Sequence, residues 1–352
     1  MESGNNLSDP LEDFKASLID ENHYDAEKHS DRLLQRFLKA RNGNVPRATQ
    51  MFMDWREWYV KAGVENIVAN FAFSEYPHVA QIYPKFIHGT DKLGRMVLYQ
   101  QHHKLDATSL FTVTSLERLE KLEIREGEKL EHYRLPACIR KSGEQADKVV
   151  VVMDANGYPF SQFLRLQGLI SQIANINSNY HPETLGLVLI INAPYTFSLL
   201  WNLIVAIVPA EVAAKCKILG TDYQQTLLDL MDADQMPAVY GGSCACSGGC
   251  ENADKGPWND GSVPGFPDSF WEGMRQRDLD AAAAVTLAAA TDSARTSTTE
   301  QFRTSVAKMK RFSLTGRRES KSSTAGAPSQ QTSVRLSYTK GESEEDVFVD
   351  AE

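Results

Sequence analysis

The chain has 352 residues, of which 42% are hydrophobic and 24% are charged, and its formal net charge at pH 7 is −9. This composition is typical of a soluble globular protein with one sizeable core and enough further chain for a smaller domain or a tail. The acidic balance argues against nucleic acid as a partner, because phosphate binding draws on an excess of Lys and Arg. No segment has transmembrane length and no secretory signal is evident, so we expect a cytosolic protein whose contact with membranes is peripheral.

The N-terminal part divides into a polar leader and a small helical module. Residues 1–28 are polar and acidic, and we expect them to bury little. Two helices follow, one from Asp31 to about Gly43 and one from Asn44 with Pro46 in its first turn, and they place the module at 29–75. Apolar residues at helical spacing give each helix an inward face: Leu33, Leu34, Phe37 and Leu38 in the first, and Ala48, Met51, Phe52, Trp55 and Tyr59 in the second.

Strands and helices alternate over residues 76–260. The expected strands are 96–99, 149–153, 187–191 and 216–219, with helical patterns between them. The run from Val149 to Met153 is continuously apolar, as expected of a strand that is covered on both faces. This alternation predicts an α/β domain with a mostly parallel sheet.

The segment FSLLWNLIVAIV, from Phe197 to Val208, would be apolar on every side of a helix. It is too short to cross a bilayer, which needs about 20 residues. It is either a helix buried in a large core or a lid over an apolar cavity that can touch a membrane. On this segment alone the core is favoured, because short apolar runs usually belong to cores.

The five cysteines are expected to be free thiols in a reducing compartment. They are Cys138, Cys216, Cys244, Cys246 and Cys250. The last three form a CxCxxxC pattern that could hold zinc if a fourth ligand came from elsewhere in the chain. This spacing is not a standard paired-CxxC pattern and the loop is rich in glycine, so we expect a surface loop without a metal.

Motifs typical of enzymes are missing from the sequence. It contains neither a GxxxxGK[ST] phosphate loop nor a GxGxxG pattern after a strand, and the stretch 241–245 ends in Ala where a GxSxG elbow needs Gly. His78, His88 and His181 are scattered, with no carboxylate at metal-ligand spacing. We therefore expect no enzymatic activity, no catalytic residues, no cofactor and no metal.

Ala, Ser and Thr dominate after Trp271, and we predict a low-complexity, mostly disordered tail over 275–352. Within it, Ser297 and Glu300 could cap a basic amphipathic helix, which would bind an anionic membrane or a calmodulin-type partner. Phosphorylation at Ser313 or Ser320 would weaken such an anchor. A solvated tail is the simpler interpretation. The apolar residues of this pattern are Phe302, Val306, Met309 and Phe312.

A series of further segments occurs in unbroken order from Asp31 to Asp260: LLQRFLKAR (33–41), YPKFIHGTDKLGR (83–95), HYRLPACIRKSG (132–143), VVMDANG (151–157), HPETLG (181–186), IINAPYTFS (190–198), KCKILG (215–220), MPAVYGG (236–242) and KGPW (255–258). Together these segments resemble the CRAL-TRIO lipid-transfer family, and within it the phosphatidylinositol/phosphatidylcholine transfer proteins of the secretory pathway.

The resemblance implies a CRAL-TRIO fold that carries one phospholipid behind a movable gate helix. It implies that the protein transfers phosphatidylinositol between membranes, Golgi or endosomal ones among the candidates, or presents it to a lipid kinase, and that it acts as a monomer. Arg41 would reach the inositol phosphate, and Glu183 and Lys215 would lie at the inositol ring. The gate and cavity would be formed by Phe197, Leu200, Trp201, Ile204, Ile207, Val149 and Val151.

Several positions depart from the family pattern. Asn42 and Thr184 stand where a lysine and an arginine are usual, and Val149 and Val151 replace two hydroxyl residues that serve the choline lipid. Lost hydroxyl donors are costly to replace in a dry cavity, so we expect weak phosphatidylcholine binding or none. Two alternatives stay open. The protein could carry another apolar ligand, such as a sterol, a tocopherol-like molecule or a retinoid, or it could be an adaptor that senses lipid while its tail recruits partners.

Overall fold

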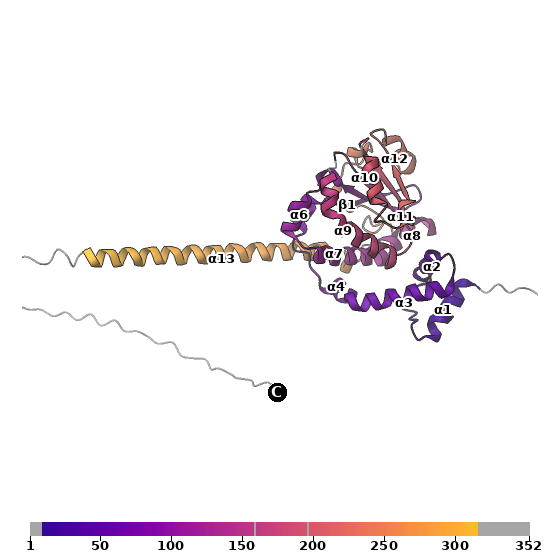
Figure 1. Ribbon diagram of the computed structural model, residues 1–352, viewed down its shortest axis with the longest axis horizontal. Helices are drawn as coiled ribbons and strands as arrows, with labels where there is room; N and C mark the ends of the chain where they lie inside the picture. Colours follow the sequence, from indigo (N-terminus) through magenta and orange to yellow (C-terminus); the bar gives the residue numbers. More distant parts are fainter. Residues whose placement is uncertain (1–8, 158–159, 196, 316–352) are drawn as a thin grey trace, which may run out of the picture. The chain divides into compact units, whose positions relative to one another are not determined.

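We analysed the protein as a computed structural model that describes residues 9–157, 160–195 and 197–315 (Figure 1). The chain forms two units, Met1–Ala289 and Ala290–Glu352. The first unit holds the helical module, the sheet and every site discussed below.

The N-terminal module contains two more helices than the sequence predicts, one before the predicted pair and one after it. Residues 9–28, the described part of the expected polar leader, are not all exposed, because α1 packs Leu11, Phe14 and Leu18 into the core of the module. Those three residues have the i, i+3, i+7 spacing of a helix face, and Asp9 caps the helix through a 3.0 Å bond from the Leu11 amide. The helices of the module are α1 (Pro10–Asp20), α2 (Asp31–Ala40), α3 (Val45–Ala62) and α4 (Val64–Asn70).

The rest of the described chain follows the predicted alternation of strands and helices. Its elements are α5 (Tyr76–Ile82), β1 (Lys85–Thr90), β2 (Met96–Gln101), η1 (His102–Lys104), α6 (Ala107–Val113), α7 (Leu116–Lys129), the π-helical turn η2 (Leu130–Arg134), α8 (Leu135–Ser142), η3 (Glu144–Ala146), β3 (Val149–Asp154), α9 (Phe160–Asn179), β4 (Leu185–Ile191), α10 (Phe197–Ile204), α11 (Ala210–Ala213), β5 (Cys216–Ile218), α12 (Gln224–Leu230), η4 (Ala238–Tyr240), η5 (Cys250–Asn252) and α13 (Ser269–Thr315).

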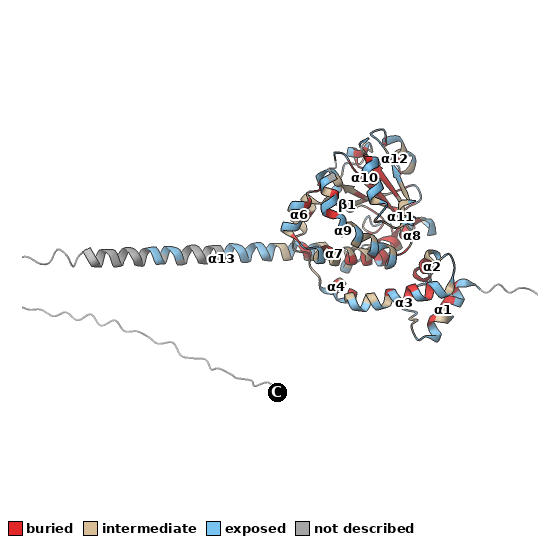
Figure 2. Cartoon of the chain, viewed as in Figure 1, coloured by how far each residue is buried: buried red, intermediate tan, exposed pale blue. Residues whose placement is uncertain are grey.

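The sheet has the order β1-β2-β3-β4-β5. β1 pairs with β2 antiparallel, and the other neighbouring strands are parallel, which confirms the prediction of a mostly parallel α/β sheet. Figure 2 shows the buried residues gathered on the strands and the exposed ones on the outer turns of the helices.

Alternate residues of β3 belong to two different cores. Val150 and Val152 pack on one face of the sheet with Leu227 of α12 and with Tyr240. Val149 and Val151 belong to the other core, which includes Phe197 and Leu200 of α10. Because side chains alternate along a strand, the apolar run of β3 serves both faces at once, as its sequence predicts.

Buried charges join the helical module to the α/β part of the same unit. Arg36 of α2 is 2% exposed and forms ion pairs with Glu131 and Asp147, and Arg32 bonds to Asp147 at 2.9 Å. These two carboxylates offset the cost of removing the Arg36 guanidinium from water.

The chain is helical well beyond residue 275, where the sequence predicts a mostly disordered tail. α13 runs from Ser269 to Thr315. Its stretch 281–290 is rich in alanine, the residue with the highest helix propensity. The prediction of disorder considered only the low complexity of the composition and left this propensity out. Ser297 lies inside this helix rather than at its start. Residues 316–352, with Ser320, and the side chains of Phe302, Val306, Met309, Phe312 and Ser313 lie outside what the structure describes.

Candidate functional site

The sheet face that carries Val149 and Val151 borders a cavity of about 800 Å³. This volume lies near the upper end of the roughly 300–1,000 Å³ that is usual for small-molecule sites. The lining is apolar along the strands, α9 and α10, and includes Met96, Leu98, Val149, Val151, Met153, Phe163, Leu166, Leu169, Val188, Ile190, Phe197, Leu200, Trp201 and Ile204. An apolar hollow of this size leaves its walls without packing partners, so the cavity is suited to a large apolar ligand.

Helix α10 forms part of the cavity wall, not the centre of a core. Phe197 and Leu200 are buried and line the cavity, whereas Leu199 is 68% exposed on the outer side. Leu203 and Val205 are also exposed. This apolar segment therefore lies at the wall of a cavity with one side exposed, while its action as a movable lid stays a prediction. Within the described residues, no helix has the length and apolar character that crossing a membrane requires.

The segment that precedes α10 is a tight corner fixed by hydrogen bonds. Asn192 has a φ of 54°, a left-handed conformation that asparagine tolerates better than most residues. Its side-chain amide donates to Asp154 at 3.0 Å, and its backbone amide donates to Gly220 at 3.1 Å. The helix ends at Ile204, before the predicted Val208. Ile207, a predicted cavity residue, packs against the neighbouring core cluster but is not part of the cavity lining.

Glu183 and Lys215 meet in the cavity lining. Lys215 Nζ lies 3.6 Å from Glu183 Oε1, and Lys148 Nζ lies 3.0 Å from Glu183 Oε2. Burial raises the pKa of Glu183, but the bond and charge of Lys148 and the charge of Lys215 outweigh it, so this pKa lies below its usual value. Glu183 is thus a carboxylate that already has one lysine partner, which leaves the charge of Lys215 partly uncompensated. Sequence reasoning missed Lys148, which directly precedes β3 and whose partner Glu183 lies 35 positions further along the chain.

Arg41 lines the same cavity from the C-terminal end of α2. Its Nη1 donates to the carbonyl of Ala40 at 2.9 Å, and no described carboxylate forms an ion pair with it. The bond to Ala40 fits a cation at the C-terminus of a helix dipole, and the free charge remains available to an anion. The structure places no direct contact between Arg41 and the Glu183–Lys215 pair among the contacts it describes.

Five buried polar atoms of lining residues have no hydrogen-bond partner in the described part of the chain. Three belong to charged side chains, namely Nε of Arg125, Nε of Arg134 and Oδ1 of Asp254, and the other two are the Ser178 hydroxyl and Nε2 of His181. Burial lowers the pKa of His181, so the ring is neutral near pH 7. Buried polar atoms are normally paired, so these two are suited to bind a polar group of a ligand or water. Thr184, by contrast, is already satisfied, because its hydroxyl donates to the His181 carbonyl at 2.9 Å.

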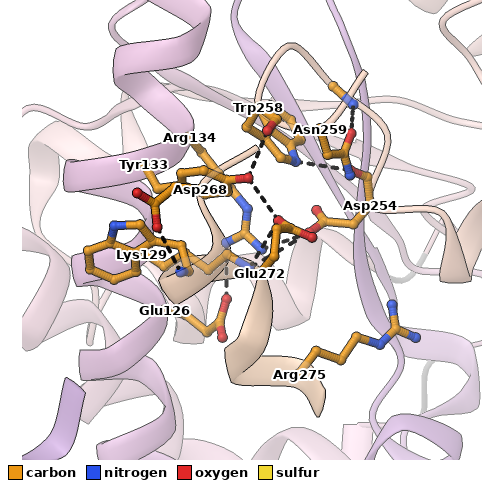
Figure 3. A network of polar contacts seen from close by, with 12 residues as sticks. Glu126, Lys129, Tyr133, Arg134, Asp254, Trp258, Asn259, Asp268, Glu272 and Arg275 are labelled. Atoms are coloured by element: carbon orange, nitrogen blue, oxygen red, sulfur yellow. Dashed lines mark hydrogen bonds and ion pairs between the residues drawn. The ribbon is translucent and has the colours of Figure 1, made fainter. Parts of the chain in front are cut away.

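A second polar group in the cavity lining is a dense network of charges (Figure 3). Arg134 bonds to Glu126 at 3.0 Å and to Asp254 at 3.3 Å, and Lys129 lies 3.7 Å from Glu272. Burial raises the pKa of Glu126, but the charges of Arg134, Arg125 and Lys129 overcome it and lower that pKa to about 2. The network joins α7 and η2 to the start of α13, and its members neutralise one another.

Sequence reasoning missed this network, although a signal was present. Leu119 and Leu122 of α7 have the spacing of an inward helix face, and the same spacing continues through Glu126, Lys129 and Tyr133. Charged residues on an apolar stripe predict buried pairs. The Tyr133 hydroxyl indeed donates to the Trp258 carbonyl at 2.7 Å.

Comparisons with known proteins were made against families, curated proteins and solved structures. Residues 81–242 match the family model of the CRAL/TRIO domain, and residues 10–54 match that of the CRAL/TRIO N-terminal domain. The second match includes α1, in agreement with its packing.

The chain is 36% identical over 234 residues to the Sec14 cytosolic factor of Schizosaccharomyces pombe, which covers 66% of this chain and 82% of that protein. It is 35% identical over 237 residues to the phosphatidylinositol/phosphatidylcholine transfer protein SFH7 of Arabidopsis thaliana, which covers 66% of this chain but only 43% of SFH7. The crystal structure of Sfh5 has a TM-score of 0.53 at 16% identity, and the match covers 79% of this chain and 99% of that one. At that identity the structural likeness concerns the fold alone.

Proposed function

This chain belongs to the CRAL/TRIO family, and from that membership we propose that it binds one phospholipid, phosphatidylinositol, in its cavity and transfers it between membranes. The observation that carries the proposal is the cavity of about 800 Å³, apolar along the sheet and α10, with Arg41, Glu183 and Lys215 in its lining. The names of relatives such as SFH7, a phosphatidylinositol/phosphatidylcholine transfer protein, support it.

The apolar lining would supply most of the binding free energy. Each methylene removed from water is worth roughly 0.8 kcal/mol, so a lipid with two acyl chains cannot cross water unshielded. The strand and helix residues of the lining would replace the bilayer around those chains. In this proposal the lipid is bound and released without a change in its covalent bonds, so the protein acts as a carrier and not as an enzyme.

The polar part of the lining has the charge that an inositol phosphate requires. Arg41 and Lys215 of the lining, and Lys148, which contacts Glu183 from outside the lining, bring three positive charges to the single negative charge of Glu183. The cations would bind the phosphate, and Glu183 would accept bonds from ring hydroxyls or orient Lys215.

Phosphatidylcholine fits the cavity less well. Val149 and Val151 of β3 are both in the lining, where hydroxyl side chains could have donated to the phosphate of a choline lipid. We therefore propose a preference for the inositol lipid and weak binding of the choline lipid.

The exposed outer face of α10 would allow the protein to load and unload at a membrane. Leu199 and Leu203 of α10, with Val205 directly after the helix, would enter the interfacial region of the bilayer while the inner face of the helix releases the ligand. The same step would present phosphatidylinositol to the membrane or to a lipid kinase. In this proposal the protein is a cytosolic monomer between such contacts.

The test combines ligand identification with a transfer assay. Native mass spectrometry of the full chain should detect bound phosphatidylinositol, and transfer between vesicles should be faster for the inositol lipid than for the choline lipid. Arg41→Ala should slow phosphatidylinositol transfer, whereas Arg47→Ala, at an exposed arginine of α3, should not.

A sterol or another apolar molecule in the native protein, together with normal behaviour of Arg41→Ala, would contradict the proposal in favour of a different cargo. Lipid binding without any transfer between vesicles would instead support the lipid-sensing adaptor.

A further inference from the structure

Four side chains that commonly bind metals converge at the edge of the sheet, and none of them is part of the cavity lining. They are His88 of β1 and Cys244, Cys246 and Cys250, and their ligand atoms all lie within 4.8 Å of one another. His88 Nε2 is 3.4 Å from Cys246 Sγ and 3.5 Å from Cys244 Sγ, and the two sulfur atoms are 3.6 Å apart.

These three separations match three of the six edges of a tetrahedron around zinc, and Cys250 Sγ lies within 4.8 Å of the other ligand atoms. Zinc binds sulfur at about 2.3 Å and imidazole nitrogen at about 2.0–2.1 Å, which places two sulfurs about 3.8 Å apart and a sulfur and a nitrogen about 3.6 Å apart. A disulfide would need a sulfur separation of about 2.05 Å, and all three cysteines are free.

The orientation of the histidine ring also suits a metal ligand. His88 is fully buried, and its Nδ1 lies 3.1 Å from the Gln235 carbonyl, which can only accept a hydrogen bond. The Nδ1 proton is therefore directed to that carbonyl, and the lone pair of Nε2 faces the sulfurs. Metal-bound histidines usually have a backbone carbonyl or a carboxylate in this position.

The surroundings balance the charge of such a site. Three thiolates and one Zn²⁺ carry a net charge of −1, since three negative charges meet two positive ones. Lys255 supplies a positive charge, with its Nζ 3.6 Å from Cys244 Sγ. Lys255 is itself held by a 2.9 Å bond to the Asp234 carbonyl.

The backbone holds the cysteines in place. The Cys244 amide donates to Met236 at 3.2 Å, and the Cys244 carbonyl accepts from Ala238 at 3.0 Å. Gly248 and Gly249 have φ values of 87° and 91°, a left-handed conformation that lets the chain return so that Cys250 faces the other ligands.

We propose that His88, Cys244, Cys246 and Cys250 form a structural zinc site. Four protein ligands complete a tetrahedron and leave no position open for water or substrate, which is typical of a structural site and not of a catalytic one. The zinc ties the edge strand β1 to the loop that leads into the charged network of Figure 3. The three cysteines lie outside residues 81–242, which match the CRAL/TRIO domain, and the inference is independent of the proposed function.

The proposal corrects the expectation of a metal-free loop. The CxCxxxC pattern shows three ligands, and the fourth lies 156 positions before Cys244. The spacing of residues along the chain could not bring His88 to the cysteines, whereas the pairing of β1 with this segment does, through a bridge between His88 and Lys255.

Metal analysis of the full chain, purified under reducing conditions without chelator, tests the site. The expected content is about one zinc per chain, released when a mercurial reagent modifies the thiols. X-ray absorption should show about three sulfur neighbours and one nitrogen neighbour. Cys246→Ser should lose most of the zinc, whereas the matched control Cys216→Ser, at a free cysteine of β5, should retain it.

Three results would overturn the assignment: reduced wild-type protein without stoichiometric zinc, a different metal in stoichiometric amount, or equal zinc content in Cys246→Ser and Cys216→Ser. If Cys246→Ser fails to fold, two measurements on the wild type still test the zinc site, because neither requires a variant. They are the X-ray absorption spectrum and the release of zinc when the thiols are modified. Loss of zinc with normal lipid transfer would leave the proposed function intact.

Discussion

Two groups of charged residues line the same cavity, and they differ in how completely they are paired. In the network around Arg134, the buried charges form ion pairs, and Arg125 binds Asp278 through two bonds of 2.8 and 2.6 Å, although Nε of Arg125 and of Arg134 and one oxygen of Asp254 have no hydrogen-bond partner among the described residues. Lys215 and Lys148 share the one carboxylate of Glu183, and the Arg41 guanidinium lacks an ion pair in the described structure. Ion-paired buried charges serve the fold, whereas incompletely compensated charges in a cavity are suited to a ligand.

The largest expected effect comes from breaking the best-paired contact. Arg125 and Asp278 are each about 2% exposed, so Arg125→Ala leaves a buried carboxylate without its partner. We expect the free energy of unfolding to fall by about 3–5 kcal/mol, measured by urea denaturation. Arg47→Ala, at an exposed arginine, should change it by less than about 0.5 kcal/mol. Equal unfolding midpoints for the two variants would show that the pair does not support the fold.

The next largest effect is expected from acid, which should reduce the contribution of the charged network around Arg134 to the free energy of unfolding. The pKa of Glu126 in the fold, about 2, lies below its ordinary value of 4.5. Its carboxylate therefore stabilises the fold fully above pH 4.5, and this contribution is lost as the pH falls through about 2. The unfolding free energy measured from about pH 6 to about pH 3 should fall less steeply in Glu126→Gln than in the wild type. Glu57→Gln, at an exposed position of α3, should keep the wild-type slope, and identical slopes in all three would refute the prediction.

Substitution of Lys215 should weaken ligand binding and leave the free energy of unfolding almost unchanged. Lys215→Ala removes a charge-assisted bond worth about 1.5–3 kcal/mol, so affinity for phosphatidylinositol should fall roughly tenfold to a hundredfold. The unfolding free energy should change by less than about 1 kcal/mol, because the pair with Glu183 is partly exposed. The matched control is Lys217→Ala, which removes an exposed lysine of β5 two positions after Lys215. A large loss of stability in Lys215→Ala would assign this group to the fold as well.

The smallest effect is expected outside the cavity, on the outer face of α10. Leu199→Asp should slow transfer between vesicles by a few fold, because a charge opposes insertion into the interface. Its effect on unfolding should stay within about 0.5 kcal/mol, because Leu199 is 68% exposed. Val60→Asp places the same charge at an exposed apolar residue of α3, 77% exposed, and should transfer normally. Equal transfer rates for both variants would remove α10 from the membrane contact.

Regular apolar patterns made much of the fold predictable. The alternation of strands and helices indicated the parallel sheet, and the unbroken valines of β3 indicated a strand with two covered faces, one of which borders the cavity. The helix α1 was missed although Leu11, Phe14 and Leu18 have helical spacing, because the surrounding charges dominate the composition of that stretch.

Contacts between distant charged residues were the least predictable part. Arg125 and Asp278 are 153 positions apart, and a single charged residue in a sequence usually indicates solvent. Lys148 and His88 were unpredictable for the same reason, since their partners are brought to them only by the folded chain. The family resemblance indicated Arg41, Glu183 and Lys215, which the structure places in one cavity lining, while their roles in ligand binding stay predictions.

Two of the five tryptophans lie at the cavity: Trp201 is part of its lining, and Trp58 contacts the lining residue His181. Trp58 stacks on Tyr180 with ring centres 3.8 Å apart, and it meets the ring of His181 edge-on at 6.5 Å, while Trp201 lies in α10 itself. Indole fluorescence depends on such neighbours, so the protein carries intrinsic optical reporters at both His181 and the cavity wall. With the other tryptophans replaced, stopped-flow emission from each one would follow cargo uptake and helix motion separately, in real time and without a labelled lipid.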